Sequence, residues 1–361
     1  MRTPIGIVMA LIVAAAGIYA FSPRLTPELD PTRLPIQEMV LTSVAETEAG
    51  LVAAGEQGHI LVSKDDGENW QSAELSQHRN ALITRLRFAD ERNGLAIGHE
   101  GWILRTTDGG LNWEEVAFDN ERGEPLLDLT ELPSGRWMAI GAFGRVLGSD
   151  DSGLSWQPIE IPDNTDWHLN GISGSADGRH WLIVGEMGTV FRSANGGETW
   201  TKVPEFYEGS LYGAVSLGNE TWVAYGMRGN IFRSTDDGKT WERSTFDIPI
   251  SLFAHRQLPD GPLLLAGQGG TILASHDQGR SFEVIRRQGK STLTDLELTP
   301  DGQWLLVSTG GLTRIPAKKS RQPNPAPFTP LNKREPHDEQ RLSYSHYAPG
   351  QSHCPTADSG A

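Results

Sequence analysis

One short motif occurs six times along the chain at nearly constant spacing. Each copy places an acidic or amide residue, a glycine and a closing aromatic at fixed offsets: SKDDGENW at 63, TTDGGLNW at 106, SDDSGLSW at 149, SANGGETW at 193, STDDGKTW at 234 and SHDQGRSF at 275. The closing aromatics are Trp70, Trp113, Trp156, Trp200, Trp241 and Phe282, at spacings of 43, 43, 44, 41 and 41. A period of about 40 to 45 residues is typical of a four-stranded propeller blade.

A second motif precedes each aromatic by twelve to fifteen residues. Its copies are GEQGHIL at 55, GHEGWIL at 98, GAFGRVL at 141, GEMGTVF at 185, GMRGNIF at 226 and GQGGTIL at 267. The two glycines bracket a tight turn, and the apolar pair after them begins a strand. Each unit is thus predicted to hold four antiparallel strands, with the Asp-Gly turn between the third and fourth. The fold class is all-β.

A seventh unit is incomplete. The segment TLTDLELTPDGQWLLVSTGGLTRIP, at 292–316, supplies three strands and then stops. We expect PTRLPIQEM, at 31–39, to provide the missing outer strand, because ring closure removes open sheet edges. The sequence therefore predicts a seven-bladed β-propeller over residues 32–316, with its ring closed by an N-terminal strand.

The two ends of the chain differ from the repeats. Residues 1–23 include an uncharged apolar stretch from Thr3 to Pro23, which indicates a signal peptide or a membrane anchor, with cleavage left open. Residues 24–31 are interpreted as a linker, and residues 317–361 as a disordered Pro-rich tail. We expect export, to the periplasm or to the periplasmic face of the cytoplasmic membrane. Cys354 is the only cysteine, so no intrachain disulfide can form.

Charge and motif content exclude several functions. The formal net charge of −15 argues against nucleic-acid binding, which requires basic residues. The sequence has no phosphate-binding loop, nucleophile elbow or zinc helix. One carboxylate on each outer hairpin does not converge into a calcium site, and His346, His353 and Cys354 lack metal-binding spacing. We expect no cofactor, no metal and a monomer.

The candidate binding site lies on one face of the predicted ring. The Gly-x-x-Gly turns and the segments between blades share the face opposite the Asp-Gly turns, and their side chains vary from blade to blade. Aromatic, methionine and arginine residues among them are typical of interface anchors. The predicted partner-binding residues are Glu56, His99, Glu100, Phe143, Arg145, Trp167, Glu186, Met187, Phe206, Tyr207, Met227 and Arg228.

The repeats resemble known families. STDDGKTW matches the Asp-box, or bacterial neuraminidase repeat, whereas Asn195 and Phe282 depart from it in two other copies. GHEGWILRTTDGGLNW (98–113) and GMRGNIFRSTDDGKTW (226–241) resemble the photosystem II stability/assembly factor family. That resemblance implies a non-enzymatic seven-bladed propeller that assists assembly of a membrane protein complex.

The chain departs from that family in its acidic charge and in its tail. Of the basic patch that photosynthetic members use, only Arg228, Arg85 and Arg145 stand at matching positions. The client is then expected to be another envelope complex, such as a transporter in a non-photosynthetic host. The alternative function is a sialidase-like glycoside hydrolase, for which Tyr212 and Glu186 are the candidate residues. Against this alternative, Tyr212 is also explained as an aromatic on an inner strand.

Overall fold

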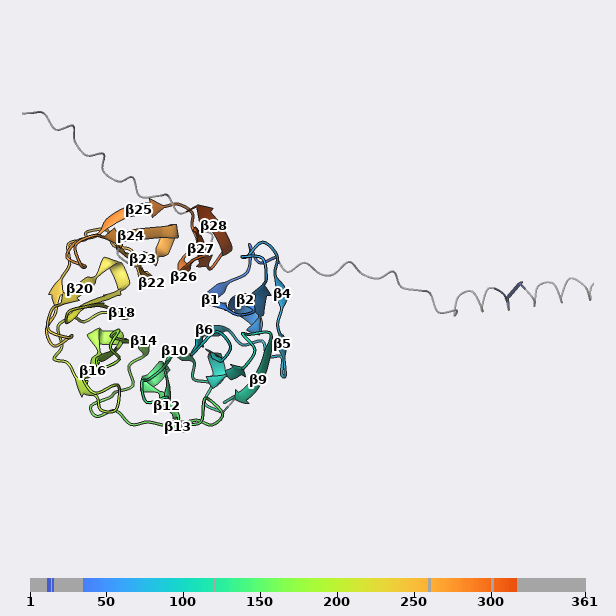
Figure 1. The fold of residues 1–361 in the computed structure, drawn as a ribbon, viewed down its shortest axis with the longest axis horizontal. Helices are drawn as coiled ribbons and strands as arrows, with labels where there is room; N and C mark the ends of the chain where they lie inside the picture. Colours follow the sequence, from blue (N-terminus) through green and yellow to red (C-terminus); the bar gives the residue numbers. More distant parts are fainter. Residues whose placement is uncertain are drawn as a thin grey trace, which may run out of the picture. The chain divides into compact units, whose positions relative to one another are not determined.

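Seven sheets surround a central axis in a computed structural model that describes residues 12, 13, 15, 35–119, 121–258, 261–299 and 302–316 (Figure 1). Each is built on antiparallel strands. This confirms the predicted seven-bladed β-propeller. The predicted signal peptide or anchor (apart from residues 12, 13 and 15), the linker and the tail lie outside the described residues. No helix in the described ranges is long and apolar enough to cross a membrane.

The strands of each blade follow one another from the axis outward. The innermost strands are β1 (Leu41–Thr47), β6 (Ile83–Phe88), β10 (Leu126–Glu131), β14 (Leu169–Gly174), β18 (Leu211–Gly218), β22 (Leu252–Gln257) and β26 (Leu293–Leu298). The second strands are β2 (Gly50–Gly55), β7 (Gly94–Gly98), β11 (Trp137–Gly141), β15 (Trp181–Gly185), β19 (Thr221–Gly226), β23 (Leu263–Gly267) and β27 (Gln303–Ser308). The third strands are β3 (Ile60–Ser63), β8 (Ile103–Thr106), β12 (Val146–Ser149), β16 (Val190–Ser193), β20 (Ile231–Ser234), β24 (Thr271–Ser275) and β28 (Gly311–Pro316). The outer strands are β4 (Gln71–Ser72), β9 (Asn112–Ala117), β13 (Gln157–Pro158), β17 (Thr201–Lys202), β21 (Glu242–Arg243) and β25 (Glu283–Arg287).

Apolar clusters fill the spaces between neighbouring blades. The second strands β7, β11, β15, β19 and β23 are buried along their whole length, as expected for strands covered on both faces. Val52 and Ile60 of the first blade pack with Trp102 and Trp113 of the second. The core is thus shared around the ring, and each blade depends on its neighbours.

Hydrogen bonds within the motif explain the six Asp-Gly turns. In the fifth blade, Asp236 Oδ1 accepts the Thr240 N–H at 2.9 Å and the Ser234 hydroxyl at 2.7 Å, while Asp236 Oδ2 accepts the Thr240 hydroxyl at 2.7 Å. The Trp241 indole N–H donates to the Gly238 carbonyl at 3.1 Å. Gly238 has a φ of +78°, and a Cβ there would meet Leu182 of the fourth blade at 2.9 Å. Each part of the motif therefore serves the hairpin or the contact with the preceding blade.

The predicted closing strand is wrong for the residues that the structure describes. Residues 35–39 form turns and not a strand, and the seventh sheet has three strands within the described ranges. Ile36 and Met39 are nevertheless buried against the seventh blade, and the Leu312 N–H donates to the Ile36 carbonyl at 3.2 Å. Pro35 favours this outcome, because proline lacks the N–H that a paired strand needs.

Contacts between the innermost strands close the ring instead. The Thr294 hydroxyl of the last blade donates to the Leu41 carbonyl of the first at 2.7 Å. The Val44 N–H donates to Asp295 Oδ2 at 3.1 Å. Thr42 and Thr84 make the same type of bond to the next blade, to the carbonyls of Ile83 and Leu126, both at 2.6 Å. The junction of the first and last blades is therefore built like other junctions in the ring.

Ile36→Ala should destabilise the propeller by about 2–4 kcal/mol, because it leaves a cavity at the junction of the first and last blades. Urea unfolding of the full-length protein measures this, and a single transition is expected. The matched control is Glu38→Ala, at an exposed neighbour. Equal midpoints for Ile36→Ala and the unaltered protein would contradict the role of this turn.

Acid should weaken the Asp-Gly hairpins. Hydrogen bonds from the Ser155 hydroxyl, the Ser155 N–H and the Ser149 hydroxyl lower the pKa of Asp151 from 3.8 to about 2. A carboxylate with a lowered folded-state pKa stabilises the protein above its unfolded pKa, and this contribution is lost as the pH falls from about 4 toward 2. Asp151→Asn should flatten the dependence of the urea midpoint on pH in this window.

The fourth blade supplies the reverse control. Asn195 makes the same contacts without a titrating group, accepting the Thr199 N–H at 3.0 Å and the Ser193 hydroxyl at 2.8 Å. Asn195→Asp should therefore steepen the same curve. Parallel curves for both variants and the unaltered protein would show that the hairpin carboxylates do not govern acid stability.

Candidate functional site

The six Gly-x-x-Gly turns form short 3-10 segments at the ends of the second strands, opposite the Asp-Gly turns. They are η1 (Glu56–Gly58), η2 (His99–Gly101), η3 (Ala142–Gly144), η4 (Glu186–Gly188), η5 (Met227–Gly229) and η6 (Gln268–Gly270). The middle residue is left-handed in every copy: Gln57, Glu100, Phe143, Met187, Arg228 and Gly269 have φ between +51° and +65°. We call this end of the propeller, with the segments that connect the blades there, the turn face.

The first residue of each turn mostly serves the fold. Glu56 Oε1 accepts the Val40 N–H at 3.1 Å, and Glu186 Oε2 accepts the His168 N–H at 3.1 Å. The sulfur of Met227 lies 3.3 Å from the Ser210 N–H. Three predicted partner-binding residues thus cap the start of an innermost strand. Sequence reasoning missed this role, although acceptor side chains recurring at the first turn position are the signal for it.

The second residue of the turn is the one that projects. Phe143 is 57% exposed and Met187 is 40% exposed, and between them Trp167 is 44% exposed. The Trp167 carbonyl accepts the Gly144 N–H at 2.9 Å, while the Phe143 ring packs edge-on against His168 at 4.9 Å between centroids. Trp167 and Met187 line one hollow of about 220 Å³. We call Phe143, Trp167 and Met187 the apolar arc.

The backbone conformation of Phe143 and Met187 is costly for these residue types. Bulky side chains with positive φ are uncommon, and the strain is of the order of 1–3 kcal/mol per residue. The sixth blade places Gly269 at this position. The fold therefore does not require Phe143 or Met187 at these positions. Residues that are retained for binding are expected to behave in this way.

Other predicted residues of this face are divided between packed and open positions. The Phe206 ring stacks on Trp241 at 5.6 Å, and Tyr207 accepts a hydrogen bond from Asn230 at 3.0 Å. The Arg145 side chain, 13% exposed, donates to Asp119 at 2.9 Å. Those three side chains support the structure. His99, Glu100 and Arg228 are exposed.

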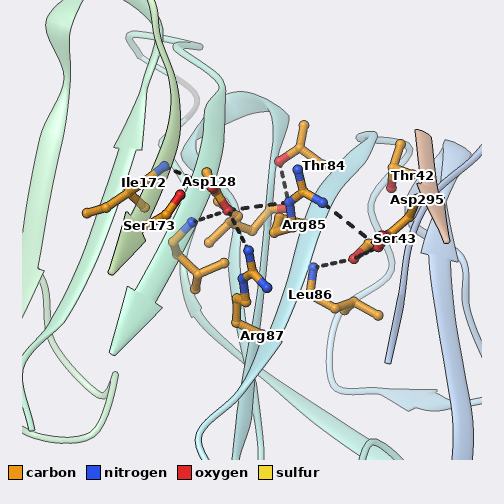
Figure 2. A network of polar contacts seen from close by, with 12 residues as sticks. Thr42, Ser43, Thr84, Arg85, Leu86, Arg87, Asp128, Ile172, Ser173 and Asp295 are labelled. Atoms are coloured by element: carbon orange, nitrogen blue, oxygen red, sulfur yellow. Dashed lines mark hydrogen bonds and ion pairs between the residues drawn. The ribbon is translucent and has the colours of Figure 1, made fainter. Parts of the chain in front are cut away.

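A polar cavity of about 640 Å³ runs between the innermost strands. Figure 2 shows its most charged part, where Arg85 lies between two carboxylates. Arg85 Nε is 3.3 Å from Asp128 Oδ1, and Arg85 Nη1 is 3.9 Å from Asp295 Oδ2. Arg87 approaches Asp128 to 3.7 Å. Burial alone would lower the pKa of Arg85, but Asp128 and Asp295 outweigh burial and raise it.

Each of these carboxylates also joins two blades through the backbone. Asp128 Oδ2 accepts the Ile172 N–H of the next blade at 3.0 Å, and Asp295 accepts the Val44 N–H and the Ser43 hydroxyl. The Ser43 hydroxyl in turn accepts the Leu86 N–H at 3.2 Å. Arg85, predicted as part of a basic patch, is therefore neutralised by its neighbours and holds the ring together.

The opposite wall of the cavity is aromatic. Gly213 leaves room for Tyr225, whose hydroxyl would lie 2.3 Å from a Cβ at that position. Tyr225 Oη lies 2.7 Å from His255 Nδ1. Burial raises the pKa of Tyr225, so the hydroxyl keeps its proton and can donate to the imidazole. Burial and the charges of Arg87, Arg85 and Arg256 lower the pKa of His255 to about 3.

The residues of the hydrolase alternative are not brought together. Tyr212 stacks on Phe253 of the next blade, with ring centroids 4.8 Å apart. Glu186 caps β14 through the His168 N–H and lies in η4. No interaction joins Tyr212 to Glu186 in the part of the chain that the structure describes, so a paired nucleophile and base are not formed.

The fold and its repeats define a class, the seven-bladed Asp-box propellers. The sequence profile of the family described as "Photosynthesis system II assembly factor YCF48" matches residues 36–107 and 106–311, which is most of the chain. The chain therefore belongs to this family, as the resemblance of its repeats predicted. No curated protein matches the sequence.

Solved structures share the fold. One described as "YCF48 bound to D1 peptide" has a TM-score of 0.62 and 18% identity, and covers 82% of this chain and 99% of that chain. "YCF48 from Cyanidioschyzon merolae" has a TM-score of 0.62 and 15% identity over 80% of this chain and 99% of that one. The WD40 β-propeller domain of Doa1 has a TM-score of 0.61 and 12% identity, covering 78% and 94%. At these identities the comparisons show the fold alone.

Mild acid should test the Tyr225–His255 contact. His255 has a folded-state pKa of about 3 against an ordinary value of 6.5, so below pH 6.5 the unfolded chain binds a proton that the folded chain refuses. Stability is then lost as the pH falls from 6.5 toward 3. His255→Gln should lower the urea midpoint at pH 7 yet flatten its decline between about pH 6.5 and 5, above the ordinary titration range of carboxylates. An unchanged slope would place the proton uptake elsewhere.

Proposed function

We propose that this protein is a non-catalytic, exported scaffold that assists the assembly or stability of a membrane protein complex. The family to which the chain belongs is described as an assembly factor of photosystem II. A solved relative of the same fold is described as bound to a D1 peptide, so a propeller of this family binds a segment of another protein. By analogy, this chain would bind a segment of a subunit of its client complex.

The observation that carries the proposal is the apolar arc. Phe143, Trp167 and Met187 expose large apolar side chains on one part of the turn face, where the positions vary from blade to blade. Buried aromatic and methionine side chains are the usual anchors of protein interfaces. The acidic charge of the chain, −15, suits a client segment that is apolar or basic.

The client is proposed to be an envelope complex, such as a transporter in a non-photosynthetic host. This follows from the departure of the charge from the basic patch of photosynthetic members. Arg85 and Arg145 are both held in ion pairs, which leaves Arg228 as the exposed arginine of the three matching positions. Two of the three arginines are therefore not available to bind an acidic segment of a client.

Removing the apolar arc should abolish client capture without unfolding the propeller. The variant combines Phe143→Asn, Trp167→Ala and Met187→Asn, because asparagine accepts the left-handed conformation readily. Capture from detergent-solubilised membranes, quantified by mass spectrometry, should fall about tenfold or more, as expected when interface anchors are lost. The melting temperature should stay close to that of the unaltered protein.

The matched control lies on the opposite face. Leu154, in the Asp-Gly turn of the third blade, is 54% exposed, and Leu154→Ala removes a comparable apolar side chain. Capture by this control should equal that of the unaltered protein. Equal capture by the triple variant would remove the turn face as the binding site.

Export is tested by fractionation of cells that make the full chain. The protein should appear in the periplasmic or the membrane fraction, since the uncharged apolar stretch of Thr3 to Pro23 precedes the propeller. Intact protein found only in the cytoplasm would contradict the proposal. N-terminal sequencing then separates a cleaved signal peptide from a retained anchor.

A further inference from the structure

The outer edges of the blades differ in length. Four outer strands, β4, β13, β17 and β21, have two residues each, whereas β9 has six and β25 has five. A long outer strand presents unpaired N–H and C=O groups on which another strand can pair. Figure 1 places β9 and β25 on the outer rim of the ring.

The edge of β9 is already covered by the chain itself. The short strand β5 (Glu74–Leu75) pairs with β9 in parallel, Glu74 with Asn112 and Leu75 with Trp113. The Ser76 N–H then donates to the Trp113 carbonyl at 2.9 Å, and the Ser76 hydroxyl accepts the Glu115 N–H at 2.8 Å. Val116 of β9 is only partly exposed and packs against a core cluster.

In the sixth blade the same covering begins and then stops. The Thr245 N–H donates to the Arg280 carbonyl at 2.9 Å, and the Phe282 N–H donates to the Thr245 carbonyl at 3.2 Å. The chain then turns inward, because Phe246 is buried in the core. Among the described residues, β24 is the only strand paired with β25.

The uncovered edge has the surface of a docking strand. Val284 and Ile285 are 37% and 53% exposed, and Ile285 corresponds in the repeat to the partly covered Val116. Residues 280–290 hold Arg280, Arg286, Arg287 and Lys290 against Glu283, a local charge of +3 (4 − 1) in a chain of −15. Arg286 is used internally, donating to the Gly270 carbonyl at 2.6 Å, whereas Arg280, Arg287 and Lys290 are exposed.

We propose that the outer edge of β25 binds an extended segment of a partner protein, rich in apolar and acidic residues, as an added strand that continues the pairing begun at Thr245. Main-chain hydrogen bonds supply affinity in this mode, and the alternating side chains supply selectivity. The exposed basic residues around β25 select an acidic segment. A second copy of this chain is disfavoured, because five residues span only about 17 Å and bury much less than the roughly 1,200 Å² that stable interfaces need.

The test uses the full chain and a fluorescent ten-residue peptide that alternates valine with glutamate or aspartate, measured by fluorescence anisotropy. Binding should weaken about tenfold or more when alternate backbone nitrogens of the peptide are methylated on one edge, since each methyl removes a strand hydrogen bond. Methylation at alternate nitrogens of the other edge should have little effect. Equal binding by all the peptides, or no binding by any, would overturn the proposal.

Two variants separate this site from others. Arg287→Glu should weaken binding of the acidic peptide and improve binding of a peptide with lysine in place of the acidic residues, which a loss of folding could not do. The apolar-arc variant should bind the acidic peptide like the unaltered protein, so failure here is distinguishable from failure of the proposed function. Peptide binding that is lost with the apolar arc, or a concentration-dependent dimer blocked by Arg287→Glu, would also overturn the proposal.

Discussion

The structure depends on hydrogen bonds by which innermost strands of several blades satisfy the backbone of the next blade. A radial array of sheets leaves one strand edge of every blade facing the axis, where backbone groups need partners. Threonine at the second position of the strand donates to the next blade, as Thr42, Thr84 and Thr294 do. Acceptors one residue later, Ser43, Asp128 and Asp295, take a backbone N–H of the next blade. Because Thr294 and Asp295 reach the first blade, the ring closes by the same interactions that join the first blade to the second.

The third position of each innermost strand also determines whether the cavity is charged or aromatic. Where it carries Arg85, Asp128 and Asp295, charges meet in the interior, and their mutual pairing compensates for lost hydration. Gly171 lets the backbone of Gly213 in the next blade approach closely, and Gly213 leaves room for Tyr225, which contacts His255. The cavity is thus charged on one side and aromatic on the other. The polar side chains of each wall are bonded to one another. This favours the turn face, and not the cavity, as the binding surface.

Much of the fold could be predicted because the repeat is local. A carboxylate, a glycine and an aromatic within eight residues specify the hairpin with little help from distant parts of the chain. The conformation of residues 35–39 could not be predicted, since it depends on contacts between residues far apart in the sequence. Residues 35–39 form a turn, and this turn buries the side chains of Ile36 and Met39 against the last blade as effectively as a strand would.

The candidate site was predictable only in part, because exposure depends on the neighbouring blade. Phe143 and Phe206 are both aromatic residues in connecting segments. Phe206 is covered because it stacks on Trp241 and packs edge-to-face with Phe232, while Phe143 packs edge-to-face with His168 and stays exposed. Likewise, the sequence around Glu186 does not indicate that its carboxylate accepts the His168 N–H and does not simply face solvent. The left-handed position in each turn is the better guide, since the fold itself would prefer glycine there.

The central claim is that clients are bound on the turn face by its exposed apolar residues. It is tested most directly by placing a photo-crosslinking phenylalanine analogue at position 143, and at position 154 on the opposite face, in cells that make the full chain. The account predicts that position 143 crosslinks to a subunit of a membrane protein complex and that position 154 does not. Crosslinks to the same subunit from position 154 alone would contradict the account.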